Sequence, residues 1–322
     1  MKTTTLGKSG LAVSRIAFGT WQLGGDWGPT NERAATAAIR RAMDQGVTLF
    51  DTAQAYGFGA SERLLAKALR GWKREEFVIA TKGGLSPQGS GVARDSSAES
   101  IRLGVEESLK ALDTDYIDLY QIHWPDPETT FTETADALAK LVADGKICHV
   151  GVSNFNAEQM ESFSATLPVE TLQPPYHLFH REIEREILPY TTAHDIGVLV
   201  YGPLAHGLLS GHLGPKTDFA PGDWRASSAD FHGETFEQNL RVVSRLQQFA
   251  KNEFGASLSQ LAIAWTLANP AVQVAIVGTR NPRHLDEALA AADTDLDTDA
   301  MQRIEHIMSV ATPIAGPSPR SV

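Results

Sequence analysis

The sequence predicts an α/β fold in which eight parallel strands and their helices close into a (β/α)8 TIM barrel. Short runs rich in β-branched residues alternate along the chain with longer segments of helical period, a pattern typical of βαβ units in a parallel sheet. Eight such runs within 322 residues favour a closed barrel over an open sheet, because a barrel of this kind uses about 250 residues. No linker-like composition divides the chain, so we expect one domain over residues 1–322.

The predicted strands are short runs bounded by turn-forming residues. In chain order they are Arg15–Gly19, Val47–Asp51, Phe77–Lys82, Ile117–His123, Ile147–Ser153, Thr171–Gln173, Gly197–Tyr201 and Val272–Val277. An N-terminal hairpin is expected in "KTTTLGKSGLAV", with its turn at Lys8-Ser9-Gly10. A long loop without a clear helix follows the seventh strand at Gly202–Glu234, and a Pro-rich tail ends the chain in "TPIAGPSPRSV".

Capping signals place helices between these strands. A Ser, Thr or Asn followed three residues later by Glu or Gln marks a helix start. This spacing occurs at Ser96 with Glu99, Thr130 with Glu133 and Asn156 with Gln159. Apolar residues then recur every three or four positions, as in "TADALAKLVADGK". Gly or Pro marks the expected helix ends at Gly71, Gly145 and Pro270.

The composition indicates an acidic globular protein. Asp and Glu number 39 against 28 Lys and Arg, which gives a formal charge of −11, and an acidic surface repels nucleic-acid phosphates and anionic lipid. We therefore expect a small-molecule substrate, with no nucleic-acid or membrane partner. The single cysteine, Cys148, is expected to be buried, and a lone Cys fits a reducing compartment. No apolar run has membrane-spanning length and no signal-peptide core is present, so a cytoplasmic protein is expected.

Polar side chains follow several predicted strands at the end where barrel active sites form. Asp51 ends the second strand, with Tyr56 just beyond it. Lys82 ends the third strand and His123 the fourth. A Lys that closes an apolar strand is expensive to bury without an anionic partner, and Asp51 on the adjacent strand would be that partner. A polar residue at one strand end is most often a turn cap, but its repetition at neighbouring strands favours an active site.

The combination of Asp, Tyr, Lys and His suits proton transfer to a carbonyl oxygen. A tyrosine titrates near 10 and is a poor acid at neutral pH. An ammonium about 4 Å away, at an effective dielectric of about 20, favours the phenolate by roughly 4 kcal/mol. The pKa of Tyr56 would fall by about three units, part of which desolvation returns, and a general acid works best with a pKa near the operating pH. Asp51 would hold Lys82 charged, and neutral His123 would hydrogen-bond the same substrate oxygen.

An ordered set of motifs resembles the aldo-keto reductase superfamily over nearly the whole chain. The similar segments are "FGTWQLGG", "FDTAQAYGFGASERLLAKAL", "VIATKGG", "DLYQIHWPD", "GVSNF", "QPPYHL", "YGPLAHGLLSG" and "VGTRNPRHLDE", in the family's order. The pattern is closer to bacterial sugar- and aldehyde-type reductases than to the steroid-reducing branch. The resemblance implies an NADPH-dependent oxidoreductase that reduces aldehyde, ketone or sugar carbonyls to alcohols without a metal. Its catalytic tetrad falls on Asp51, Tyr56, Lys82 and His123.

The resemblance also implies which residues hold the cofactor. The nicotinamide-carboxamide contacts fall on Ser153, Asn154 and Gln173, and the aromatic residue that stacks on the nicotinamide falls on Tyr201. The complete implied set is Gly19, Thr20, Trp21, Asp51, Ser153, Asn154, Gln173, Tyr201, Gly202, Pro203, Leu204, Gly207, Leu209, Gly211, Gly278, Thr279, Arg280, His284 and Glu287.

Two positions depart from the family pattern. Gly202 stands where many members have Ser, although its backbone N–H can still meet a phosphate. Ala288 stands where many have an adenine-contacting Asn. For the substrate, three tryptophans that follow predicted strands are expected to wall a pocket together with two tetrad members. The expected substrate-binding residues are Trp21, Trp27, Tyr56, His123 and Trp124.

The closing motif predicts a preference for NADPH over NADH. Pro282 suits the first position of a helix, and the free N–H groups of a helix N-terminus attract phosphate. Arg280 adds a guanidinium that can bind a phosphate with two hydrogen bonds. In the resembling family this block faces the adenosine ribose, so Arg280, with Thr279, is expected on the 2′-phosphate. Acidic Glu287 would instead favour the unphosphorylated ribose.

Other interpretations stay open at this point. The same chemistry can run mainly as a sugar or alcohol dehydrogenase. A barrel enzyme could instead use Lys82 as a Schiff-base nucleophile, and a non-catalytic nicotinamide-binding subunit is a third reading, since the family resembles channel-associated β-subunits. "GFGASE" lacks the last Gly of the dinucleotide fingerprint.

No metal site is expected from the sequence. The histidines of "HLFH", His177 and His180, have a spacing that suits a metal, but no carboxylate or Cys cluster accompanies them. The long loop after the seventh strand carries His206, His212 and His232, and all three are expected at the surface.

Overall fold

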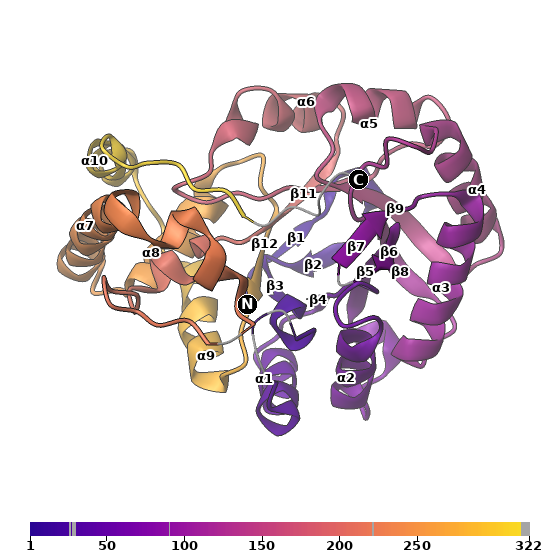
Figure 1. Ribbon diagram of the computed structural model, residues 1–322, viewed down its shortest axis with the longest axis horizontal. Coiled ribbons are helices and arrows are strands. Elements are labelled where there is room, and N and C mark those ends of the chain that lie inside the picture. The colour runs from indigo at the N-terminus through magenta and orange to yellow at the C-terminus, as the bar shows by residue number, and fades with distance from the viewer. Residues whose placement is uncertain (26, 28–29, 90, 221, 317–322) are drawn as a thin grey trace.

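Eight parallel strands form a closed barrel, in the order β10-β11-β12-β3-β4-β5-β8-β9, and helices surround it (Figure 1). The protein is seen in a computed structural model that describes residues 1–25, 27, 30–89, 91–220 and 222–316. The predicted (β/α)8 barrel is therefore confirmed. Every strand pair in the barrel is parallel, as expected for βαβ units.

The barrel strands agree with the predicted ones to within two residues at each end. They are β3 (Ile16–Gly19), β4 (Leu49–Asp51), β5 (Val78–Gly83), β8 (Ile117–Ile122), β9 (Ile147–Ser153), β10 (Thr171–Gln173), β11 (Gly197–Tyr201) and β12 (Val274–Gly278). The last strand begins two residues later than predicted because the N–H of Val272 bonds to the Asn269 carbonyl in a turn.

Two hairpins flank the barrel. The predicted N-terminal hairpin pairs β1 (Thr3–Thr5) with β2 (Ala12–Ser14), and Leu6 and Val13 pack against the residues that fill the barrel interior. A second hairpin, β6 (Leu85–Gln88) with β7 (Gly91–Arg94), follows β5 directly. The sequence did not predict it, because "LSPQ" and "GVAR" show no alternation of apolar and polar residues.

Ten α-helices lie among the described residues, and most begin at a side-chain cap. They are α1 (Glu32–Asp44), α2 (Ala60–Leu69), α3 (Ala98–Leu112), α4 (Phe131–Ala143), α5 (Ala157–Ser164), α6 (Ile187–Ala193), α7 (Gly233–Phe249), α8 (Leu258–Ala268), α9 (Pro282–Ala290) and α10 (Thr298–Met308).

The three predicted capping boxes had different outcomes. Asn156 and Gln159 form a complete box at α5. Thr130 caps α4, but the Glu133 carboxylate accepts from the Ala98 N–H instead of closing the box. The box predicted at Ser96 is wrong, because the Ser96 N–H donates to Asp126 and Ser97 is the residue that caps α3.

The predicted long loop after β11 holds only short 3-10 turns before α7 begins at Gly233. These are η5 (Ala205–Ser210), η6 (Trp224–Ser227) and η7 (Ala229–Phe231). The first part of the C-terminal tail packs on this loop, where the Ala315 N–H donates to Asp230 Oδ2 at 3.2 Å, and the Ile314 N–H bonds to the Phe179 carbonyl before β11. Pro221 and residues 317–322 of the predicted loop and tail lie outside the described residues. In the part of the chain that is described, no helix is both long and apolar enough to cross a bilayer.

Two burial predictions were wrong. Cys148 is exposed, as the second residue of β9. His206 is buried rather than on the surface, because aromatic side chains from two loops enclose it. The other two loop histidines, His212 and His232, are exposed as expected.

Candidate active site

The ends of β4 and β5 bring together the buried ion pair that the sequence predicts. Lys82 Nζ lies 2.7 Å from Asp51 Oδ1, and the two side chains are only 1% and 5% exposed. Lys82 also donates to the Thr52 carbonyl at 2.8 Å, and Gln173 Nε2 donates to Asp51 Oδ2 at 2.7 Å. Burial lowers the pKa of Lys82, while the Asp51 carboxylate opposes this shift. Neither carboxylate oxygen of Asp51 is left without a donor, as a buried charge requires.

Tyr56 and His123 complete a compact group around this pair. The Lys82 ammonium lies 5.2 Å from the centre of the Tyr56 ring. The rings of Tyr56 and His123 meet edge to face, with centroids 5.7 Å apart. Burial, and then the Lys82 charge, hold the pKa of His123 well below its usual range. At neutral pH His123 is therefore an uncharged imidazole, and its buried Nδ1 has no hydrogen bond within the described chain.

The predicted nicotinamide residues lie on the three strands that continue around the barrel mouth. Ser153 Oγ donates to the Gln173 carbonyl at 2.8 Å, and Asn154 Nδ2 donates to the His123 carbonyl at 3.0 Å. Asn154 adopts a left-handed backbone with φ 62°, a conformation that Asn tolerates better than most residues. Its Oδ1 accepts from the Tyr201 hydroxyl at 2.9 Å, which fixes the half-exposed Tyr201 ring beside this amide group.

The end of β12 supplies a second group of predicted cofactor residues. Pro282 is the first residue of α9, as predicted, with Asn281 as the N-cap. Thr279 Oγ accepts from the Asn281 N–H at 3.1 Å and so shapes this turn. The Arg280 guanidinium donates to the carbonyl of Trp27, in the loop after the neighbouring strand β3, at 3.2 Å. Ala288 is buried in the core, so its side chain is not available to an adenine ring.

The remaining predicted cofactor residues lie along the strand ends and the start of the long loop. Gly19 and Gly278 pair across β3 and β12, and Thr20 bonds to the Asp51 carbonyl. Gly202, Gly207 and Gly211 have left-handed backbones. Leu209 is fully buried. On α9, exposed His284 stacks with His212 and Glu287 is half-buried.

An aromatic wall borders the tetrad, and part of it was not predicted. Trp21 lies between Tyr56 and Trp27, at ring separations of 6.4 and 5.2 Å. Trp224 packs against Trp27 at 6.0 Å and against His206 at 5.1 Å, and His206 returns to Trp21 at 6.2 Å. Trp224 and His206 were missed because the loop that carries them has no periodic pattern. The aromatic residues within that loop were the one sequence feature that could have indicated a contribution to the site.

Trp124 and the His177–His180 pair are the remaining predicted features. Trp124 lies beside the β6–β7 hairpin, where the Arg94 guanidinium stacks 5.1 Å from its ring. The rings of His177 and His180 are 5.7 Å apart, and His206 lies 5.9 Å from His177. Within the described ranges, no group of three or more His, Cys, Asp or Glu side chains has a geometry that could hold a metal.

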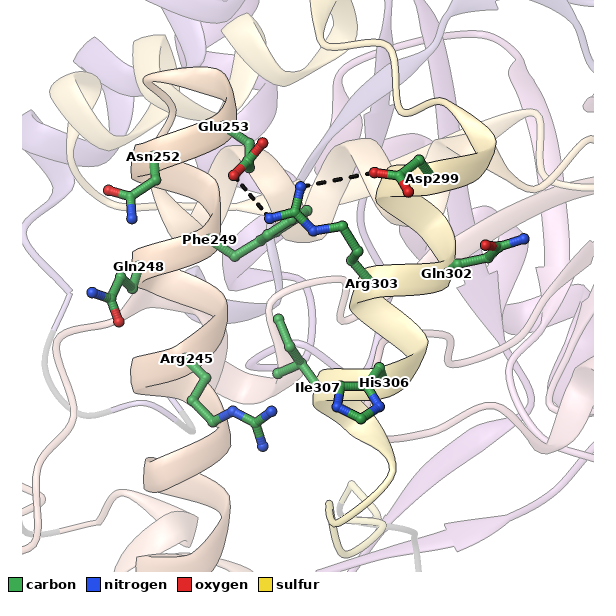
Figure 2. A pocket seen from close by; sticks show the side chains of 10 residues that line it. All are labelled: Arg245, Gln248, Phe249, Asn252, Glu253, Asp299, Gln302, Arg303, His306 and Ile307. Carbon is green, nitrogen blue, oxygen red and sulfur yellow. Dashed lines mark hydrogen bonds and ion pairs between the residues drawn. The ribbon is translucent and has the colours of Figure 1, made fainter.

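A surface groove elsewhere on the molecule shares no residue with this site. It lies between α7 and α10, has a volume of about 490 Å³ and is lined by polar and charged side chains. Figure 2 shows Arg303 of α10 between Glu253 and Asp299. Its guanidinium nitrogens lie 2.8 Å from Glu253 Oε1 and 3.8 Å from Asp299 Oδ2. These ion pairs offset the charge of Arg303.

Residues 15–309 match a family model described as the aldo/keto reductase family. The chain is 41% identical to an aldo-keto reductase named YhdN from Bacillus subtilis, over 96% of this chain and 94% of that protein. It is 33% identical to an NADH-specific methylglyoxal reductase from Escherichia coli, over 93% and 96%. The solved structure of a glycerol dehydrogenase from Gluconobacter oxydans superimposes with a TM-score of 0.86 at 38% identity and covers 96% of each chain.

Proposed function

Because the chain belongs to the aldo/keto reductase family, we propose that it is an NADPH-dependent oxidoreductase that reduces aldehyde, ketone or sugar carbonyls. One observation carries the proposal. The Lys82–Asp51 pair is buried at 2.7 Å directly beside the rings of Tyr56 and His123. No purely structural role requires an ammonium, a phenol and an uncharged imidazole to meet at the mouth of a barrel.

The residues of this group have distinct tasks in the proposed reaction. Tyr56 gives its phenolic proton to the carbonyl oxygen, and the Lys82 ammonium stabilises the phenolate that remains. Asp51 holds Lys82 in place through their hydrogen bond. Neutral His123 orients the same oxygen by hydrogen bonding, since its low pKa prevents it from competing as a proton donor. In the reverse direction Tyr56 accepts the proton of an alcohol.

The side chains present fit a nicotinamide cofactor, which would supply the hydride for this chemistry. Asn154 fixes the Tyr201 ring at one side, and Ser153, Asn154 and Gln173 place amide and hydroxyl groups next to it. The side-chain N–H of Gln173 donates to Asp51. The side-chain oxygen of Gln173 can then accept a hydrogen bond from a carboxamide. Among the described residues, a Cβ added at Gly202 would come no closer than 3.8 Å to His206 and 3.9 Å to His177, which leaves room for a phosphate beside this backbone. The preference for NADPH depends on Arg280 at the α9 N-terminus.

The substrate class follows from the pocket and from the similar proteins. Trp21 and Trp27 restrict the space beside Tyr56, which favours small carbonyl compounds. One similar protein is named for reducing methylglyoxal and another for oxidising glycerol. Both names point to small, oxygen-rich molecules, and they support either direction of the reaction. The presence of all four tetrad side chains argues against a non-catalytic subunit.

The test compares the wild-type protein with Tyr56→Phe on a set of small aldehydes, ketones, sugars and polyols, with NADPH or NADP⁺ and with NADH or NAD⁺. Turnover should fall at least about 10²–10⁴-fold in Tyr56→Phe, the range of general acid catalysis, while the Kd of the cofactor stays within about twofold. Near-normal turnover in Tyr56→Phe would remove Tyr56 from the acid role. Trapping of a substrate adduct by borohydride, without any change in cofactor absorbance, would instead support a Schiff base on Lys82.

A further inference from the structure

A fully buried carboxyl group lies directly behind the tetrad and takes no part in the reaction as proposed. Glu62 is the third residue of α2, the helix that follows the Tyr56 loop, and none of its surface is exposed. Glutamate is almost never buried to this degree without a partner. Its Oε1 accepts a hydrogen bond from Thr81 Oγ at 2.7 Å. Its Oε2 lacks a hydrogen bond of ordinary geometry among the described residues.

Glu62 is connected to the strand that carries Lys82. Thr81 immediately precedes Lys82, and successive side chains of a strand point to opposite faces. Lys82 therefore faces the barrel interior, while Thr81 faces α2 and receives Glu62. The helix and the catalytic ammonium lie on the two sides of one strand, joined through two adjacent residues of β5.

The residue before Glu62 ties the same helix turn to the other strand ends. Ser61 Oγ donates to Thr20 Oγ at 2.7 Å and accepts from Thr52 Oγ at 3.2 Å. Its N–H donates to the Tyr56 carbonyl at 3.2 Å. The first turn of α2 thus contacts the ends of β3, β4 and β5 together with the Tyr56 loop.

The charges around Glu62 decide its ionisation. Burial raises the pKa of Glu62 above its usual value, and the hydroxyls of Thr81 and Ser108 and the charge of Arg63 offset only part of this rise. The N-terminal turn of a helix also favours a negative charge. Glu107 of the neighbouring helix α3 opposes that charge. After burial, the charge of Glu62 is itself a cause of the raised pKa of the Tyr120 phenol on β8. On the other side, Lys82 is the buried cation that attracts it.

We propose that Glu62 is a positioning residue of the active site: an ionised carboxylate that holds Thr81 and whose negative charge stabilises the ammonium of Lys82 from behind β5. This inference rests on the proposed roles of Tyr56 and Lys82. Asp51 alone neutralises Lys82 from within the barrel, and desolvation works against the ammonium there. A second carboxylate outside the substrate pocket supports the charged form without competing for the substrate oxygen.

The test is Glu62→Gln, which keeps the shape and an oxygen acceptor for Thr81 but removes the charge. Without the carboxylate, the Tyr56–Lys82 pair should lose its first proton at lower pH. In the pH profile of kcat for carbonyl reduction, the alkaline limb should therefore shift to lower pH by roughly half to one pH unit. At a fixed pH on that limb, kcat should be about three- to tenfold lower than in wild type. KM and the melting temperature should not worsen, since a desolvated charge has been removed.

A second measurement does not depend on turnover. The ultraviolet phenolate absorbance of Tyr56, taken as the difference between each protein and its Tyr56→Phe version, should appear at lower pH in Glu62→Gln. This separates the outcomes: an inactive wild-type protein would contradict the proposed function, whereas an unshifted Tyr56 titration in Glu62→Gln would contradict the role of Glu62.

Matched variants distinguish positioning by charge from general effects. Glu107→Gln removes an acidic charge from an exposed neighbour on α3 and should leave the alkaline limb in place. Thr81→Val removes the hydroxyl that stabilises the ionised Glu62 carboxylate. The alkaline limb of its kcat profile should therefore move to lower pH, as in Glu62→Gln. Thr81→Ser keeps a hydroxyl and should have the wild-type limb. These two variants decide the question if Glu62→Gln does not fold. Equal profiles for Thr81→Val and Thr81→Ser, or an equal shift in Glu107→Gln, would overturn the proposal.

Discussion

Replacing Lys82 by Met tests the buried ion pair on which the proposed chemistry depends. Methionine has a similar length but no charge, so the substitution removes the hydrogen bonds from Nζ to Asp51 at 2.7 Å and to the Thr52 carbonyl at 2.8 Å. Breaking a buried pair by removing one partner destabilises a protein by about 3–5 kcal/mol. Asp51 keeps its bond from Gln173, and the desolvation of Lys82 is relieved, so we expect the lower end, about 3 kcal/mol.

The expected loss is large enough to appear in a thermal scan. A change of 1 kcal/mol shifts Tm by about 2–4 °C in a domain of 150–250 residues and by less in a longer one, so Lys82→Met should melt roughly 5 °C below wild type. Scanning calorimetry of the cofactor-free protein at neutral pH measures this directly. The variant should also be inactive, because the phenol of Tyr56 loses the charge that makes it an effective acid.

A double variant separates the ion pair from simple loss of packing. In Asp51→Asn with Lys82→Met, Asp51 no longer leaves an unpaired charge inside the barrel, and most of the lost Tm should return although activity does not. Equal melting temperatures for wild type and Lys82→Met would refute the buried-pair reasoning. A double variant less stable than the single one would show that packing or the Thr52 contact, rather than the charge, causes the loss.

Three further predictions concern the rest of the site. Arg280→Ala should weaken NADPH binding roughly ten- to a hundredfold, because a charge-assisted hydrogen bond is worth about 1.5–3 kcal/mol; fluorescence titration should show NADH binding nearly unchanged, with Arg280→Lys intermediate, and an equal loss for both cofactors would remove Arg280 from the 2′-phosphate. Burial lowers the pKa of His206 from 6.5 to about 4, so the unfolded chain takes up a proton that the folded chain refuses, and stability is lost as pH falls from about 6.5 to about 4, by roughly 3 kcal/mol at the lower end. In His206→Gln the drop in Tm between pH 7.5 and pH 5 should be smaller than in wild type, and an equal drop would contradict the assignment. Activity should survive dialysis against a chelator, and a complete loss that a divalent metal restores would require a metal in the reaction.

The sequence by itself was sufficient to predict the barrel and the Asp51–Lys82 contact at its mouth. Strands such as Ile147–Ser153 carry their own hydrophobic run, and in a closed parallel barrel all their carboxyl ends meet on one face. Once the strand order was known, Asp51 and Lys82 had to be neighbours, because β4 and β5 are adjacent. A buried Lys82 ammonium requires an anionic partner, and this requirement predicted the ion pair with Asp51 that the structure contains.

The tertiary structure alone decided which loop and helix side chains join the site. His206 is buried and Trp224 partly buried against Trp21 and Trp27, about two hundred residues earlier in the chain. Local periodicity does not predict contacts between segments so far apart. Glu62 reads in the sequence as an ordinary acidic residue in the first turn of a helix, and only the packing of α2 against β5 encloses it. The period of the hydrophobic residues predicts which face of a regular helix or strand is buried. Polar residues in loops and first turns acquire their surroundings from distant segments, so their burial and charge state follow only from the folded chain.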